Sequence, residues 1–208
     1  MSLTRTRHLF GGISETGIDH FLTVFFTSRP HLLAYGTAAY ATDPTKVTLI
    51  DTSSLPSFLS GLQALIAFSI PTVDITPADS ATEPLPPGVD QFTFSTNVVI
   101  RFLCGEGRDR VHEIVAALTL SALCQPDIID SSPGTGSIGI SLLAVKVGGI
   151  APPEIEQILE CILAAVLRWA LAQVRIPFQV FTIGGVSLTL QEGPLAEDDQ
   201  IDVRGDIS

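Results

Sequence analysis

The segment PPEIEQILECILAAVLRWALAQV, residues 152–174, predicts a helix that is apolar around most of its circumference. Pro152 and Pro153 suit the first turn of a helix, whose N–H groups have no partner within the helix. The apolar side chains leave only one narrow polar stripe; they are Ile155, Ile158, Leu159, Ile162, Leu163, Val166, Leu167, Trp169 and Ala170. We therefore expect this helix to be buried on several sides. What encloses it then defines the fold.

The composition indicates more apolar surface than a chain of this size usually carries. The 208 residues are 46% hydrophobic and 16% charged, with a mean hydropathy of +0.42. This length allows one large domain or two small ones, and we expect a single domain over residues 1–208. We expect no transmembrane segment, because Glu160, Arg168 and Gln173 interrupt the longest apolar run. The excess hydrophobicity is therefore assigned to an extended core, a lipid-like cavity or a subunit interface.

The net charge of −11 argues against nucleic acid as a partner. Nucleic-acid modules carry a basic face, whereas basic residues gather here only at residues 5–8 and 108–110. The chain starts without the apolar core of a signal peptide, which predicts a cytoplasmic protein unless export takes another route. Cys104, Cys124 and Cys161 are odd in number and irregularly spaced. We expect buried free thiols rather than disulfides or a zinc site.

Residues 91–103 predict the clearest strand of the chain. Phe92, Phe94, Thr96, Val98, Ile100 and Phe102 fall on one face, and Thr93, Ser95, Asn97 and Arg101 on the other. This alternation is typical of a half-buried antiparallel strand. Further strands are expected at residues 46–51, 64–76 with a break at Pro71, 111–123, 138–147, 178–191 and 200–207, the last two forming a hairpin around an acidic turn.

A first helix is predicted over residues 16–28, with Thr16 as N-cap and Asp19 as its partner in a capping box. Ile18, Phe21, Leu22 and Phe25 give it one apolar face. One or two further helical turns are expected within residues 55–63. The element order predicts an α+β fold, in which a long, highly curved antiparallel sheet wraps around the helix at residues 153–174. A flat sheet with the helix on one face is the alternative.

Two stretches resemble the tubular lipid-binding (TULIP) superfamily, which includes bactericidal/permeability-increasing protein. They are ISETGIDHFL at residues 13–22 and IPFQVFTIGGVSLTLQEGPLAEDDQIDVRGDI at residues 176–207. The first is similar to the lead into the first helix of those modules, and the second to their closing segment. The resemblance implies one module in which a curved sheet wraps a long helix and acyl chains lie between them. Many members pair two modules, whereas this chain has room for one.

Motifs of catalysis are missing from the sequence, and we expect no enzyme and no cofactor. GTGSIG at residues 134–139 has neither the G-x-S-x-G pattern of a hydrolase nor the lysine of a phosphate loop. His112 and Glu113 are neighbours on a predicted strand, so their side chains face opposite ways. The carboxylates at Glu192, Glu197, Asp198 and Asp199 are expected to be solvated turn charges rather than a metal site.

Two functions follow as hypotheses. The first is binding or carriage of lipid or another apolar small molecule in a groove between the sheet and the long helix. Its candidate ligand-binding residues are Phe92, Phe94, Val98, Ile100, Phe102, Ile158, Ile162 and Trp169, although a packed core would use the same residue types. The second is a structural or interaction subunit of a homo-oligomer or larger assembly, joined through an open sheet edge.

Overall fold

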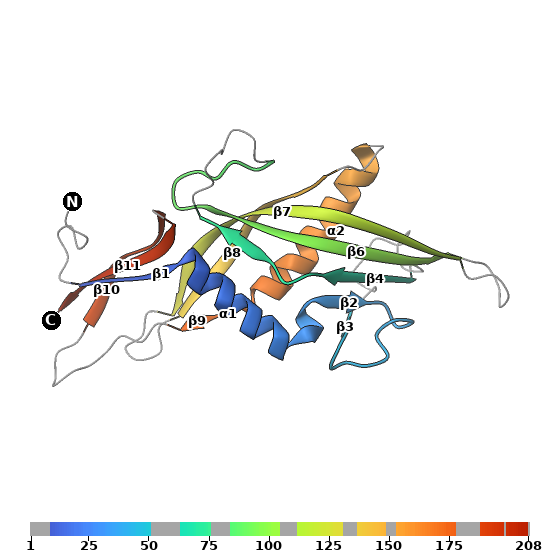
Figure 1. The fold of residues 1–208 in the computed structure, drawn as a ribbon, viewed down its shortest axis with the longest axis horizontal. Helices are drawn as coiled ribbons and strands as arrows, with labels where there is room; N and C mark the ends of the chain where they lie inside the picture. The colour runs from blue at the N-terminus through green and yellow to red at the C-terminus, as the bar shows by residue number, and fades with distance from the viewer. Residues whose placement is uncertain are drawn as a thin grey trace.

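The computed structural model describes residues 9–50, 63–75, 84–104, 112–130, 137–148, 153–177, 188–197 and 199–207. Its elements are β1 (Leu9–Ser14), α1 (Glu15–Ser28), η1 (Pro30–Leu32), β2 (Ala34–Gly36), β3 (Thr48–Leu49), β4 (Gln63–Phe68), β5 (Thr72–Asp74), β6 (Phe92–Cys104), β7 (His112–Asp130), β8 (Ser137–Val147), α2 (Pro153–Leu171), β9 (Ile176–Pro177), β10 (Leu188–Glu197) and β11 (Gln200–Ile207). The α+β class and the curved, largely antiparallel sheet are confirmed (Figure 1).

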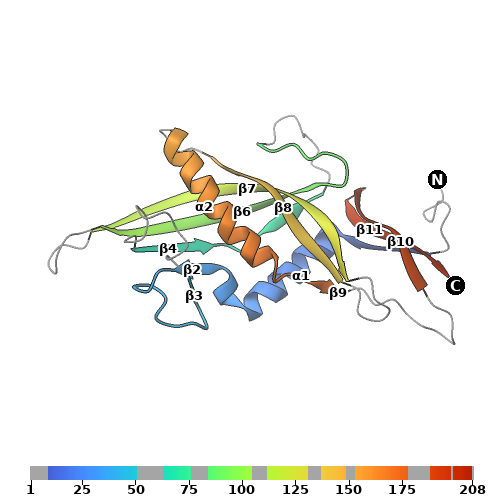
Figure 2. The ribbon, with the colours of Figure 1, turned by 180° about the vertical axis from the view of Figure 1, so that it is seen from behind.

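The large sheet has the strand order β3-β2-β4-β6-β7-β8-β9, with β5 also paired to β6. All of its pairs are antiparallel except β2 with β3. The long strands β6, β7 and β8 cross beneath α2, which runs over one face of the sheet (Figure 2). A separate sheet of β1, β11 and β10 lies at one end of the molecule (Figure 1).

The expected strand at residues 91–103 is confirmed as β6, with one face buried from Phe92 to Ile100. β7 runs further than the strand expected at residues 111–123, because it continues to Asp130. Phe92 begins β6 and pairs with Cys124, so Pro126 lies beyond the end of β6. A proline without an N–H is tolerated at such an edge.

The break expected at Pro71 is confirmed, because β4 ends at Phe68 and β5 begins at Thr72. The expected strand at residues 46–51 is reduced to the two residues of β3. The acidic turn is also shorter than expected, since β10 continues through Glu197. The helical turns predicted within residues 55–63 fall almost wholly outside the described residues, as do residues 178–187 of the next-to-last expected strand.

The start of α1 differs from the expectation. Ser14 is the N-cap and accepts from Gly17 N at 3.3 Å, so the helix begins at Glu15 and Thr16 lies within its first turn. Asp19 does not serve a capping box, because its Oδ1 accepts from Val73 N at 2.9 Å. Glu15 Oε2 likewise accepts from Ile75 N at 3.1 Å. The two carboxylates thus bind the backbone of strand β5 and its end, which anchors α1 to the edge of the sheet.

We expect Asp19→Ala to lower the free energy of unfolding by about 1 to 3 kcal/mol, because the N–H of buried Val73 loses a charged acceptor. Asp19→Asn retains an acceptor oxygen and should recover part of the loss. His20→Ala, at an exposed neighbouring position, serves as the control and should change stability by less than about 0.5 kcal/mol. Urea denaturation of the three variants measures the differences, and equal losses for Asp19→Ala and His20→Ala would contradict this role.

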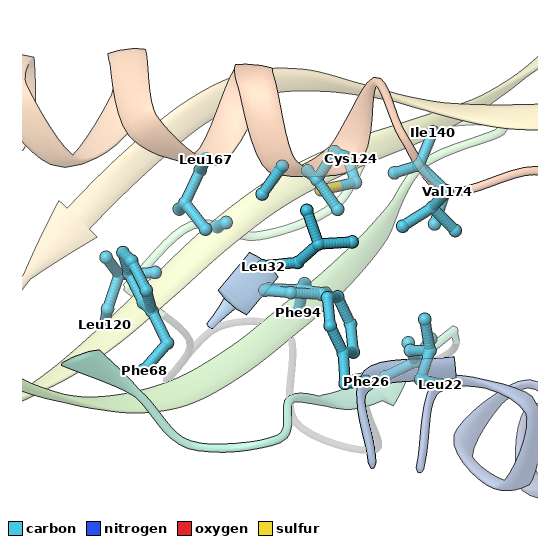
Figure 3. Packing of buried hydrophobic residues seen from close by; sticks show 14 of the residues in the cluster. Leu22, Phe26, Leu32, Phe68, Phe94, Leu120, Cys124, Ile140, Leu167 and Val174 are labelled. Atoms are coloured by element: carbon cyan, nitrogen blue, oxygen red, sulfur yellow. The ribbon is translucent and has the colours of Figure 1, made fainter. Parts of the chain in front are cut away.

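One hydrophobic core joins both helices to the large sheet (Figure 3). α1 contributes Ile18, Leu22 and Phe26 to it. α2 contributes Leu163, Leu167, Ala170 and Leu171. Sheet residues that complete it include Phe68, Phe94, Leu120, Cys124 and Ile140.

The expectation that α2 is buried on several sides is wrong for three of its apolar residues. Ile155, Ile158 and Trp169 are 46%, 43% and 46% exposed, whereas Leu163 and Leu171 are 0% and 1% exposed. One face of the helix packs on the sheet, and the apolar band extends beyond that face. Cys161 lies on the exposed side of α2, so it is not the buried thiol that we expected, whereas Cys124 is buried. None of the described helices is long and apolar enough to cross a membrane.

The small sheet carries a buried ion pair. Asp202 and Arg204 lie two residues apart on β11 and therefore share one face. Arg204 Nη2 lies 3.0 Å from Asp202 Oδ2, with the side chains 4% and 3% exposed. Ile201, on the opposite face, is also buried. The strand is therefore covered on both faces.

Candidate functional site

An apolar groove of about 370 Å³ lies between α2 and the strands β2, β3, β4 and β6. Its described lining residues are Tyr35, Thr37, Thr48, Leu49, Ile50, Ala64, Ile66, Ile100, Phe102, Leu159, Ile162, Leu163, Ala165, Val166 and Trp169. The volume falls within the range of about 300 to 1,000 Å³ that is usual for small-molecule sites. Lining residues Leu49 and Trp169 are 61% and 46% exposed, so the groove opens to solvent beside them.

The regular spacing of strands and helix places the lining side chains. On the sheet, Ala64 of β4 pairs with Phe102 of β6, and Ile66 pairs with Ile100. These residues are two apart on each strand and therefore point to the same face. On α2, lining residues recur at three- and four-residue steps, at positions 159, 162, 166 and 169. One helix face and one sheet face thus oppose each other across the groove.

Each hydroxyl among the described lining residues is bonded within the protein. Tyr35 Oη donates to Leu32 O at 2.7 Å. Thr37 Oγ1 donates to Gln63 Oε1 at 2.9 Å and accepts from Ala64 N at 3.1 Å. Thr48 Oγ1 donates to His31 O at 2.7 Å. With these donors engaged, the wall presents a ligand mainly with hydrocarbon.

Tyr35 has a central place in the wall. Burial raises the pKa of its phenol far above the ordinary value, so the hydroxyl stays neutral and remains a donor. Its ring makes edge-to-face contacts with Trp169, at 5.8 Å between centroids, and with Phe68, at 6.0 Å. Such aromatic pairs prefer this geometry. The contacts connect α2, β2 and β4 at one end of the groove.

Charged residues are missing from the described lining of the groove. An ion-pair cluster lies instead where α2 meets β8: Lys146 Nζ contacts Glu156 and lies 3.1 Å from Glu160 Oε1. Its hydrogen bonds to these two carboxylates raise the pKa of Lys146. Glu160 Oε1 also accepts from Val147 N at 3.1 Å. This cluster anchors α2 to the sheet and takes no part in the groove.

The groove offers no acid, base or metal ligand among its described residues. Elsewhere in the described part of the chain, no group of His, Cys, Asp and Glu is arranged to hold a metal ion. Burial raises the pKa of the Cys124 thiol to about 12, which keeps it protonated and unreactive at neutral pH. What this arrangement can do is enclose an apolar group.

Of the residues predicted from sequence, Ile100, Phe102, Ile162 and Trp169 line the groove. Phe92, Phe94 and Val98 lie in the packed core and are at most 2% exposed. Ile158 is not among the lining residues and is half-exposed on α2. Sequence reasoning missed Tyr35, Thr37, Thr48, Leu49, Ile50, Ala64, Ile66, Leu159, Leu163, Ala165 and Val166. The alternation along β4 and the helical spacing on α2 were the available signals.

Comparison with protein-family models gives no match to this chain, and comparison with curated protein sequences gives none either.

Proposed function

We propose that this protein binds or carries lipid or another apolar small molecule, without catalysis, in the groove between α2 and the sheet. The observation that carries the proposal is the wall of the groove. Its described residues present mainly hydrocarbon, and their three hydroxyls are bonded to other groups of the protein. A ligand group that needs hydrogen bonds would lose those to water and gain none. A straight aliphatic chain makes no hydrogen bonds to water and therefore loses none when it enters the groove.

Burial of the ligand's aliphatic chain would supply the binding affinity. Each methylene removed from water contributes about 0.8 kcal/mol. Ten methylenes would contribute about 8 kcal/mol before the loss of chain and translational entropy is subtracted. The open side at Leu49 and Trp169 lets a polar headgroup remain in water.

The same proposal gives a role to the exposed apolar band of α2. In a TULIP-like module a curved sheet wraps a long helix and acyl chains lie between them. Here Ile162, Val166 and Trp169 line the groove. Of the exposed apolar residues of α2, a ligand would then cover Trp169, whereas Ile155 and Ile158 lie outside the described lining.

Native mass spectrometry of the purified protein, with extraction and mass analysis of any bound lipid, tests the proposal. We expect a monomer that carries apolar molecules and takes up dodecan-1-ol when it is supplied. Val166→Glu places a carboxylate at a half-buried position of the groove wall and should weaken dodecan-1-ol binding by at least about tenfold. Ala172→Glu adds the same charge at an exposed position outside the lining and should bind as the wild type does. Equal binding by both variants would rule out this groove.

A second candidate function, as a structural or interaction subunit, is favoured by the outer edge of β8. Among the described residues, β9 pairs with β8 only at Ser137 and Ile138. Strand edges of this kind can pair with another chain. The Glu160 carboxylate already binds Val147 N at the far end of β8. A ligand-free oligomer that becomes monomeric when Leu143 is replaced by proline would favour this function over carriage.

A further inference from the structure

Four side chains of the described groove wall carry a hydrogen that can be donated in a hydrogen bond: those of Tyr35, Thr37, Thr48 and Trp169. The three hydroxyls already donate to other groups of the protein, at 2.7 to 2.9 Å. The indole N–H of Trp169 makes no hydrogen bond with any described residue. It is therefore the one side-chain donor among the described lining residues that a ligand can use.

This donor lies at the open side of the groove. Trp169 is 46% exposed, so water reaches its indole ring. A buried indole N–H needs a partner inside the protein, whereas one that water reaches does not. The ring is held by its edge-to-face contact with Tyr35, at 5.8 Å between centroids. The N–H thus belongs to a well-placed ring at the side where a ligand leaves the groove.

Another part of the wall is buried. Ala64, Ile100 and Leu163 line the groove and are at most 3% exposed. Their side chains are hydrocarbon and have nothing to donate. A ligand therefore meets two different surfaces, a hydrogen-bond donor at the open side and hydrocarbon at the buried wall.

We propose that the Trp169 indole N–H donates a hydrogen bond to an oxygen at the polar end of the ligand and so fixes the direction in which the ligand lies. This inference rests on the proposed function and names the ligand class: an aliphatic chain that ends in a hydroxyl or carbonyl oxygen. The oxygen lies beside Trp169, where it also keeps contact with water. The chain covers the buried wall at Ala64, Ile100 and Leu163.

Dodecan-1-ol and dodecane-1-thiol test this hydrogen bond, because they carry the same chain and differ in the atom that accepts. Sulfur accepts only weakly. The preference for oxygen is the Kd of the thiol divided by the Kd of the alcohol, both measured by isothermal titration calorimetry under reducing conditions. Comparing this ratio between protein variants cancels the different hydration of the two compounds. A neutral hydrogen bond changes affinity by a factor of about 2 to 10.

Trp169 is the only tryptophan of the chain, so biosynthetic replacement of tryptophan by 3-benzothienylalanine changes this residue alone. The analogue keeps the shape of the ring but has sulfur in place of the N–H, and it should lower the preference for oxygen by a factor of about 2 to 10. Trp169→Phe also lacks the N–H and should do the same. Tyr35→Phe removes a lining hydroxyl that already donates to Leu32 O, so this matched control should keep the wild-type preference.

The outcomes separate the two proposals. A preference that falls in the benzothienylalanine protein and in Trp169→Phe, but not in Tyr35→Phe, supports the role of the indole N–H. A preference that is unchanged in the benzothienylalanine protein, or that falls equally in Tyr35→Phe, overturns this role and leaves the proposed function standing. A wild-type protein that binds neither compound overturns the proposed function, and the role of Trp169 with it.

Discussion

Leu163→Ala should lower the free energy of unfolding by about 3 to 5 kcal/mol, the largest loss that we expect from a single apolar truncation on α2. Leu163 is 0% exposed and belongs to the core that joins α2 to the sheet. Truncation removes buried methyl groups and leaves a cavity that the surrounding sheet and helix fill only in part. Chemical denaturation followed by circular dichroism gives the difference directly.

Ile158→Ala is the matched control, because it shortens an aliphatic side chain on the same helix at a position that is 43% exposed. Its loss of partial burial is offset by the higher helix propensity of alanine, and we expect a change of less than about 1 kcal/mol. Comparable losses at both positions would mean that α2 is enclosed all round in the folded protein, which contradicts the one-sided packing described above.

Arg204→Met should destabilise the small sheet by about 3 to 5 kcal/mol, since the buried Asp202 carboxylate then loses the guanidinium that lies 3.0 Å from it. The effect is large because both side chains are almost fully buried. Arg168→Met makes the same substitution at an exposed position on α2 and should change stability by less than about 0.5 kcal/mol. Thermal unfolding of the two variants provides the comparison.

The double variant Asp202→Leu with Arg204→Met shows whether the stability lost in Arg204→Met comes from a buried Asp202 carboxylate that has lost this guanidinium. Replacing both members of a buried ion pair by apolar residues removes that charge, and we expect much of the lost stability to return. Asp202→Leu alone is measured as well. If the double variant loses as much stability as Asp202→Leu and Arg204→Met together, Asp202 and Arg204 do not act as a pair.

Strands could be predicted from the sequence where apolar and polar residues alternate over many positions. Residues from Phe92 to Phe102 alternate over several periods, and β6 follows them closely. β2 has only three residues, from Ala34 to Gly36, and pairs with β4 about thirty positions further on. Three residues are too few to show a period of two. The sequence therefore predicts no strand at Tyr35, although this residue lines the groove and its ring contacts Trp169.

The burial of α2 was overestimated for a different reason. Helical spacing identified the apolar band correctly, but it carries no information on how far a sheet extends around that band. Leu163 and Ile158 are equally apolar in sequence, yet one is in the core and the other is half-exposed. Ile162 and Trp169 could be assigned to the groove because they lie on the apolar band, whereas Thr48 and Leu49 reach it only through long-range pairing of β3 with β2.

Trp169, the only tryptophan of the chain, lines the groove and is 46% exposed, so its emission reports on the space between α2 and the sheet. Titration of the protein with dodecan-1-ol while this emission is recorded tests the central claim most directly. We expect the emission to shift to shorter wavelength and the shift to saturate at one dodecan-1-ol molecule per protein. Val166→Glu should abolish this shift. An emission spectrum that stays unchanged throughout the titration would contradict the claim that an aliphatic chain enters this groove.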